Sequence, residues 1–128
     1  MSKEVNTMVK KKLNIAELIA NAENIKKKKE ETKEFYVKSL DGTVTIMKPN
    51  AELMSDCFDM EDSHESDLYL IYESCIEPNL KDPQLHAAYG TVGYEILDKI
   101  FDPGEIAGLS TSIVEFAGYK NSIEEIKN

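Results

Sequence analysis

The sequence predicts a mainly α domain of the α+β class, a compact bundle of about five to six short helices with one β-hairpin on its N-terminal side, at about residues 34–48. Two observations carry this prediction. Apolar residues recur at helical spacing through most of the chain after residue 50, and an Asp-Gly pair lies between β-branched residues. Strands and helices do not alternate, so a doubly wound parallel sheet is not expected.

Residues 1–33 are expected to form a Lys-rich flexible segment that contains a short amphipathic helix. Residues 1–12 show no period and end in a run of lysines, so they are expected to be disordered. Asn14-Ile15-Ala16-Glu17 has the pattern of a helix N-terminus. The apolar stripe of this helix consists of Ile15, Leu18, Ile19, Ala22 and Ile25.

The hairpin is predicted around Asp41-Gly42, which Phe35 and Val37 precede and Val44 and Ile46 follow. Asp-Gly between such residues favours a tight turn between two antiparallel strands. A two-stranded hairpin is not stable alone. It is therefore expected to pack on the helices or to pair with another chain.

Two capping signals open the central helices. Asn50 can cap a helix that carries Leu53, Met54, Cys57 and Phe58. Asp62 and Glu65 have the spacing of a capping box for the next helix, which Pro78 ends. The apolar face of that second helix is expected to contain Leu68, Ile71, Tyr72, Cys75 and Ile76.

The last helices begin with a repeated Asp-Pro pattern. An Asp can cap free N–H groups, and Pro fits the first helical position. Asp82-Pro83 predicts a helix over residues 83–89 that Gly90 stops, and Asp102-Pro103 predicts one that Gly118 stops. In the second copy Glu105 can complete a capping box. A further helix is predicted near residues 94–101, so the globular domain is expected to span residues 34–118, with a tail at 119–128.

The charge is unevenly distributed along the chain. Residues 1–33 hold nine lysines and five acids, a net charge of +4, whereas residues 34–128 hold six lysines and nineteen acids, a net charge of −13. An acidic body repels phosphate, and the chain has no arginine, so nucleic acid is not an expected partner. No apolar run approaches the roughly 20 residues of a membrane helix, and no secretory signal is evident, so a cytoplasmic protein is expected.

The sequence shows no pattern that predicts catalysis, a cofactor or a metal. Phosphate-binding glycine motifs and a nucleophile elbow are absent. The two histidines, His64 and His86, are interpreted as a solvated residue and as part of a polar helix face. Acids between Asp56 and Asp67 lack the glycine of a calcium loop and are interpreted as a solvated face. Cys57 and Cys75 are expected to be small buried apolar residues within helices, not a disulfide.

A partner-binding surface is the remaining candidate. Ile15, Leu18 and Ile19 form a stripe that suits a helix docking on a partner or on another copy. The alternative is that this helix folds back onto its own domain. Tyrosines of the helical region are a second source of contacts, because Tyr combines apolar area with a hydroxyl. From these, Tyr69 and Tyr89 are taken as candidate contacts, and no catalytic, cofactor-binding or metal residue is proposed.

Residues 34–117 resemble a known family in the order of their distinctive strings. These are the hairpin with its Asp41-Gly42 turn, Asp67-Leu68-Tyr69-Leu70-Ile71-Tyr72-Glu73, Glu77-Pro78-Asn79-Leu80-Lys81-Asp82-Pro83 and Ile100-Phe101-Asp102-Pro103-Gly104-Glu105-Ile106. In this order they are similar to the XkdN-like tail assembly chaperones of phages and of defective prophages in Gram-positive bacteria.

The resemblance implies a non-catalytic protein without cofactors. Chaperones of this kind act in the cytoplasm of the host bacterium, where they are thought to bind the tape measure protein and to bring tail tube subunits to it. They are absent from the mature tail. The expected partners are thus the tape measure protein and the tail tube protein. Self-association stays open, and the charge and composition argue against nucleic acid and a membrane as partners.

Two other classes of function stay open on the sequence. One is a small acidic adaptor that binds an unrelated protein partner. The other is an acidic metal-dependent enzyme, for which the only feature is the density of carboxylates.

Overall fold

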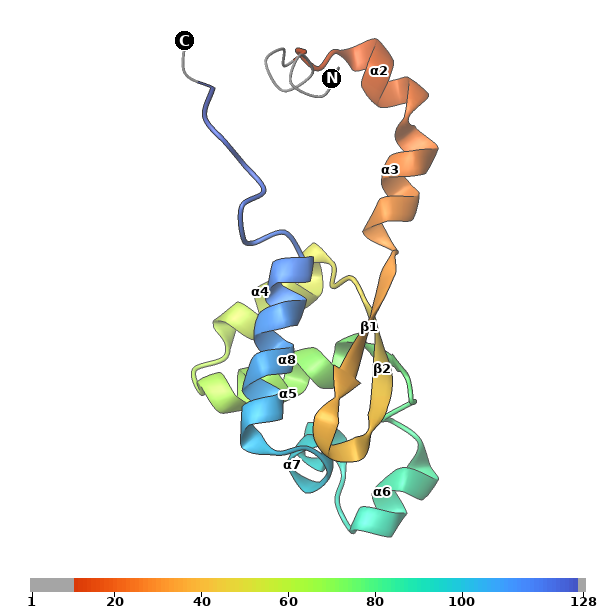
Figure 1. The fold of residues 1–128 in the computed structure, drawn as a ribbon, viewed down its shortest axis with the longest axis vertical. Coiled ribbons are helices and arrows are strands. Elements are labelled where there is room, and N and C mark those ends of the chain that lie inside the picture. The colour runs from red at the N-terminus through yellow and green to blue at the C-terminus, as the bar shows by residue number, and fades with distance from the viewer. Residues whose placement is uncertain (1–10, 127–128) are drawn as a thin grey trace.

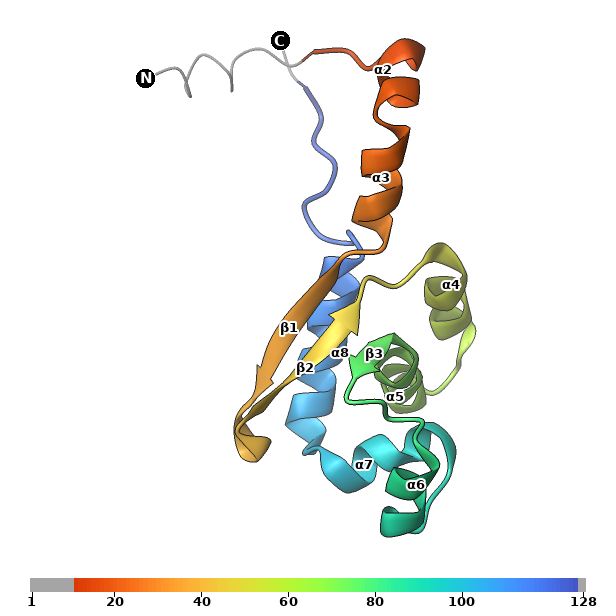
Figure 2. The same cartoon turned by 90° about the vertical axis from the view of Figure 1, so that its right-hand side faces the viewer.

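The computed structural model describes residues 11–126 and has the mixed α+β fold predicted from the sequence. A helical arm, α2 (Ile15–Ala20) and α3 (Ala22–Lys29), projects from one end of a compact body, which we define as residues 32–116. Figures 1 and 2 show the arm and the C-terminal segment leaving the body at the same end. The disorder predicted for residues 1–12 falls largely outside the described residues.

The body contains a three-stranded antiparallel sheet in the order β1-β2-β3. The predicted hairpin is β1 (Thr32–Val37) and β2 (Gly42–Met47), joined by a 3-10 turn at Lys38–Leu40 and by Asp41, whose φ of 50° is left-handed. Aspartate tolerates this region better than most residues. The hairpin therefore forms at the predicted turn, although β1 begins two residues before the expected position.

The third strand was not predicted. β3 (Cys75–Glu77) follows directly on a helix and pairs with β2, where Ile46 opposes Cys75. The prediction that Cys75 and Ile76 lie in a helix is therefore wrong. Helical spacing continues through these residues in the sequence, but pairing with a strand about 30 positions away is a tertiary contact that local spacing does not register.

Helices α4 (Ala51–Asp59) and α5 (Ser63–Ser74) begin where the capping signals predicted. The Asn50 side chain accepts a hydrogen bond from the Leu53 N–H at 2.8 Å, and Asp62 accepts from the Glu65 N–H at 3.1 Å. Each bond satisfies one of the free donors of a first helical turn. These local signals thus set the start of both helices.

The two Asp-Pro signals also mark helix starts. They open α6 (Pro83–Tyr89) and α8 (Pro103–Phe116), with α7 (Ile96–Ile100) between them after a 3-10 turn at Gly93–Glu95. Asp82 accepts from the Gln84 N–H at 2.8 Å, and Glu105 accepts from the Asp102 N–H at 2.9 Å. Gly90, at a φ of 64°, ends α6 as expected.

The core lies between the sheet and helices α5, α7 and α8 (Figure 2). Its largest side chains with almost no exposure come from β2, from helices α4, α5, α7 and α8, and from the loop before α6: Ile46, Met54, Leu68, Ile71, Leu80, Ile96, Leu97, Ile106 and Ile113. Ser110 on α8 donates a 2.7 Å hydrogen bond to Asp67 on α5. Burial of this continuous cluster holds the sheet and the helices together.

Candidate partner-binding surface

The arm consists of two short helices with no buried side chain. Asn14 caps α2 by accepting from the Glu17 N–H at 2.8 Å. The helix is interrupted at Asn21, whose side chain donates to the Glu17 carbonyl at 2.9 Å, and α3 continues to Lys29. Neither helix buries a residue, so within the described part of the chain the arm does not fold back onto the body.

Three predicted contact residues lie together on α2. Ile15 is 71% exposed and Ile19 is 70% exposed, and Leu18 is also exposed. Exposing a row of large apolar side chains to water raises the free energy of the molecule unless another surface covers them. The structure thus places the stripe where a partner can reach it, whereas its role as a contact stays a prediction.

The two predicted tyrosines lie elsewhere and apart from each other in the fold. Tyr69 is half-buried on α5 and makes an edge-to-face contact with Tyr94, with ring centres 6.0 Å apart. Tyr89 is exposed at the C-terminal end of α6. Helices α2 and α6 lie at opposite ends of the molecule (Figures 1 and 2), so the five predicted residues do not form one surface.

Tyr69 belongs instead to an acidic groove of about 380 Å³ between α4, α5 and the end of β2. Its walls include three carboxylates, Glu52, Asp56 and Glu73, and one lysine, Lys48. Burial, and after it the charge of Glu73, raises the pKa of the Tyr69 hydroxyl, so this group stays a neutral donor. Lys81 lies 2.8 Å from Glu73 and neutralises part of the charge.

The chemistry of this groove suits a basic segment, because carboxylates line it and apolar side chains form part of it. This groove was not identified by the sequence analysis. Its acids come from two helices that only the tertiary structure brings together, and in a chain with 24 acids no local signal selects these three.

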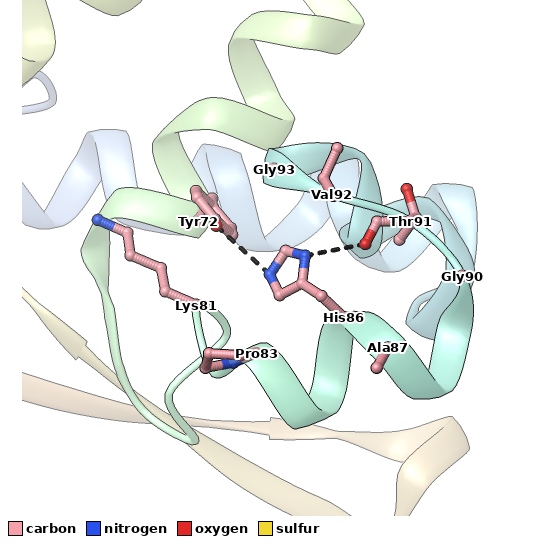
Figure 3. A pocket seen from close by; sticks show the side chains of 9 residues that line it. All are labelled: Tyr72, Lys81, Pro83, His86, Ala87, Gly90, Thr91, Val92 and Gly93. Carbon is pink, nitrogen blue, oxygen red and sulfur yellow. Dashed lines mark hydrogen bonds between the residues drawn. The ribbon is translucent and has the colours of Figure 1, made fainter.

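A second open pocket surrounds His86 between α5 and α6 (Figure 3). Its ring nitrogens lie 3.2 Å from the Thr91 carbonyl oxygen and 2.8 Å from the Leu80 carbonyl oxygen. The Tyr72 hydroxyl lies 3.4 Å from the same ring. The ring therefore links the segment before α6 to the segment after it, so its hydrogen bonds have a structural role.

The remaining polar and thiol groups also serve packing. His64 at the start of α5 lies 2.9 Å from Asp98 on α7. Burial raises the pKa of Cys57 and of Cys75 to about 11, so both thiols stay protonated and poorly nucleophilic. Both cysteines are free. Within residues 11–126, no group of three or more His, Cys, Asp or Glu is arranged to hold a metal ion.

Among the helices of residues 11–126, none combines the length and apolar character needed to span a bilayer.

Comparison with known protein families gives a match over most of the chain. The model of the family described as phage XkdN-like tail assembly chaperone protein matches residues 20–128. The match includes α3, the whole body and the C-terminal segment, and it begins after Ile15, Leu18 and Ile19. No curated protein and no solved structure matches the chain.

Proposed function

Because the chain belongs to the family of XkdN-like phage tail assembly chaperones, we propose that it binds the tape measure protein and helps to recruit tail tube subunits while the tail is built. We further propose that it does so without catalysis, in the cytoplasm of the host bacterium, and that it leaves before the tail is mature. The family match over residues 20–128 is the observation that carries this proposal.

The arm supports a binding role. Its α2 helix presents Ile15, Leu18 and Ile19 to solvent, and no described part of the chain buries them. An amphipathic helix of this kind binds by laying its apolar face against a complementary apolar surface. The lysines at the end of α3 add positive charge to the same arm, which favours a partner that carries acidic as well as apolar side chains.

The test is co-expression of the chain with the tape measure protein from the same tail gene cluster. We expect the chain to raise the soluble yield of the tape measure protein and to be recovered with it. Equal insolubility of the tape measure protein with and without the chain would contradict the proposal.

A matched pair of variants tests the arm within this assay. Leu18→Asp places a charge in the apolar stripe, and Ala20→Asp adds the same charge on another face of α2. We expect Leu18→Asp to reduce the recovered complex and Ala20→Asp to leave it near the wild-type level. Equal recovery with both variants would exclude the stripe as the contact, while the effect of the wild-type chain would still test the function.

A further inference from the structure

The first strand of the sheet has an open edge. β1 pairs only with β2 in the order β1-β2-β3. The Lys48 N–H donates to the Glu31 carbonyl at 2.9 Å, which continues the register in which Thr32 opposes Met47. Hydrogen-bonded and non-hydrogen-bonded pairs alternate along such a ladder. It follows that Thr32, Glu34 and Tyr36 direct their backbone N–H and C=O groups away from β2.

These outward backbone groups have no partner among the described residues. Neither the backbone nor a side chain of residues 11–126 makes a hydrogen bond to the N–H or C=O of Thr32, Glu34 or Tyr36. An edge of six residues with free donors and acceptors is a template for another strand.

An apolar groove runs beside this edge. It has a volume of about 380 Å³ and lies between β1 and α8, where Phe35, Phe101 and Leu109 contribute to its walls. Phe35 and Leu109 are only partly buried, and Tyr36 at the same strand is 59% exposed. A strand added at the edge would cover these side chains as well as satisfy the backbone groups.

The sequence of β1 is compatible with pairing to itself. When two copies of β1 pair antiparallel about a two-fold axis, each residue whose backbone N–H and C=O point away from β2 must lie opposite another such residue. Registers centred on Lys33 or on Glu34 set like charges directly opposite each other, which is unfavourable. A register centred on Tyr36 pairs only residues 35–37 of the strand.

The register centred on Phe35 avoids both problems. It pairs residues 33–37 of the two copies and sets Phe35 opposite Phe35, beside the apolar groove. In the same register Glu34 faces Tyr36, and Lys33 faces Val37. Aromatic pairs of this kind stabilise neighbouring strands, and no like charges meet.

We propose that β1 is an interface for a second copy of this chain. The two β1 strands pair antiparallel about a two-fold axis at Phe35, so that the three-stranded sheets join into one continuous sheet with the order β3-β2-β1-β1-β2-β3. The interface is separate from the arm and goes beyond the proposed binding of the tape measure protein. It can therefore be tested on the chain alone.

The first measurement is the mass of the purified full chain by light scattering after size exclusion, over a range of concentrations. We expect a doubling of the monomer mass. A monomer at every concentration overturns the proposal. This holds even if an extended segment of another protein pairs with the edge, because the proposed occupant is a second copy of this chain.

The second measurement determines the register by cysteine cross-linking. Phe35→Cys sets two thiols in a non-hydrogen-bonded pair, where Cβ atoms lie about 4.5–5.5 Å apart and a disulfide can form with small adjustment. We expect Phe35→Cys to give a disulfide-linked dimer under mild oxidation. The wild-type chain stays unlinked, because Cys57 and Cys75 are buried. Phe35→Ser shows by circular dichroism whether the site tolerates the loss of the ring.

Lys33→Cys is the matched control. In the proposed register Lys33 faces Val37 and lies far from the Lys33 of the second copy, so this variant does not link to itself. Linking of Lys33→Cys to itself as efficiently as Phe35→Cys overturns the register and with it the proposal. Dissociation of the dimer by Leu18→Asp would equally overturn it, because the contact would then lie on the arm.

Tyr36→Pro provides a test that does not need a disulfide. The Tyr36 N–H faces away from β2, and an edge strand accepts proline at such a position. We expect this variant to keep its circular dichroism spectrum and to become monomeric. A folded Tyr36→Pro dimer would contradict pairing through this edge.

Discussion

In the arm, residues 15–29 carry apolar side chains at helical spacing and bury none of them, whereas α8 in the body carries the same kind of spacing and buries Ile106, Ile113 and Phe116. The two regions differ in what lies opposite the apolar face. In the body that face meets α5 and the sheet; in the arm no described residue covers it. Periodicity therefore identifies an apolar face, but tertiary structure decides whether the chain itself or a partner covers it.

Thiol reactivity gives the largest contrast between the two regions. Ile19→Cys on the arm should react with a thiol reagent at the rate of an unfolded peptide. Cys57 and Cys75 should react more than about 100-fold more slowly near neutral pH, because burial raises the pKa of both thiols to about 11 and blocks access. Labelling followed by mass spectrometry measures both rates. Comparable rates would show that the body opens as readily as the arm.

Truncation of an apolar side chain should separate the regions by stability. Ile113→Ala removes a side chain with no exposure and should lower the free energy of unfolding by about 2–5 kcal/mol. Ile19→Ala removes one that is 70% exposed and should change it by less than about 0.5 kcal/mol. Urea unfolding monitored by circular dichroism measures both. A large loss in Ile19→Ala would mean that the arm packs on the body in solution.

Loss of a helix cap in the body should have a smaller effect. Asp82→Ala leaves the Gln84 N–H without its acceptor and should cost about 1 kcal/mol. Asp82→Asn keeps an acceptor oxygen and should stay within a few tenths of a kcal/mol of the wild type. Thermal unfolding compares the pair. If both substitutions cost the same, the carboxylate acts through its charge and not as a cap.

The smallest expected effect is a pH dependence at the junction of the hairpin and α8. The contact with Ser39, followed by the hydrogen bond from the Asp102 N–H, lowers the pKa of Glu105 from its ordinary value of 4.5. A lowered folded-state pKa contributes stability above that ordinary value, and the contribution is lost as the pH falls through the lowered pKa. Glu105→Gln should therefore lose less stability than the wild type between about pH 7 and about pH 3 in urea titrations.

Local chemistry made most of the fold predictable. The Asn50, Asp62, Asp82 and Asp102 signals each set a helix start through groups within about three residues, so the sequence displays them directly. β3 could not be predicted in this way, since Cys75 extends the helical spacing of α5 and leaves the helix only to pair with Ile46. The competing tertiary contact outweighs the local pattern.

The candidate surfaces differ in the same way in how far the sequence predicts them. The apolar stripe of α2 was predictable because Ile15, Leu18 and Ile19 lie within one turn and a half of a single helix. The acidic groove around Tyr69 and the apolar groove beside Phe35 were not, because each joins elements that are distant in the sequence. Tyr89 was selected by residue type alone. Its side chain is exposed in the structure, but it does not lie on the same surface as Tyr69.

The break at Asn21 has a kinetic consequence for the arm. It divides the arm into helices of six and eight residues, and isolated helices shorter than about 12–15 residues are only marginally stable in water. A partner that holds the arm in helical form must therefore supply the free energy of ordering it, which weakens the complex relative to the apolar area it covers. Such a limit on affinity shortens the time that the arm stays on any surface it binds.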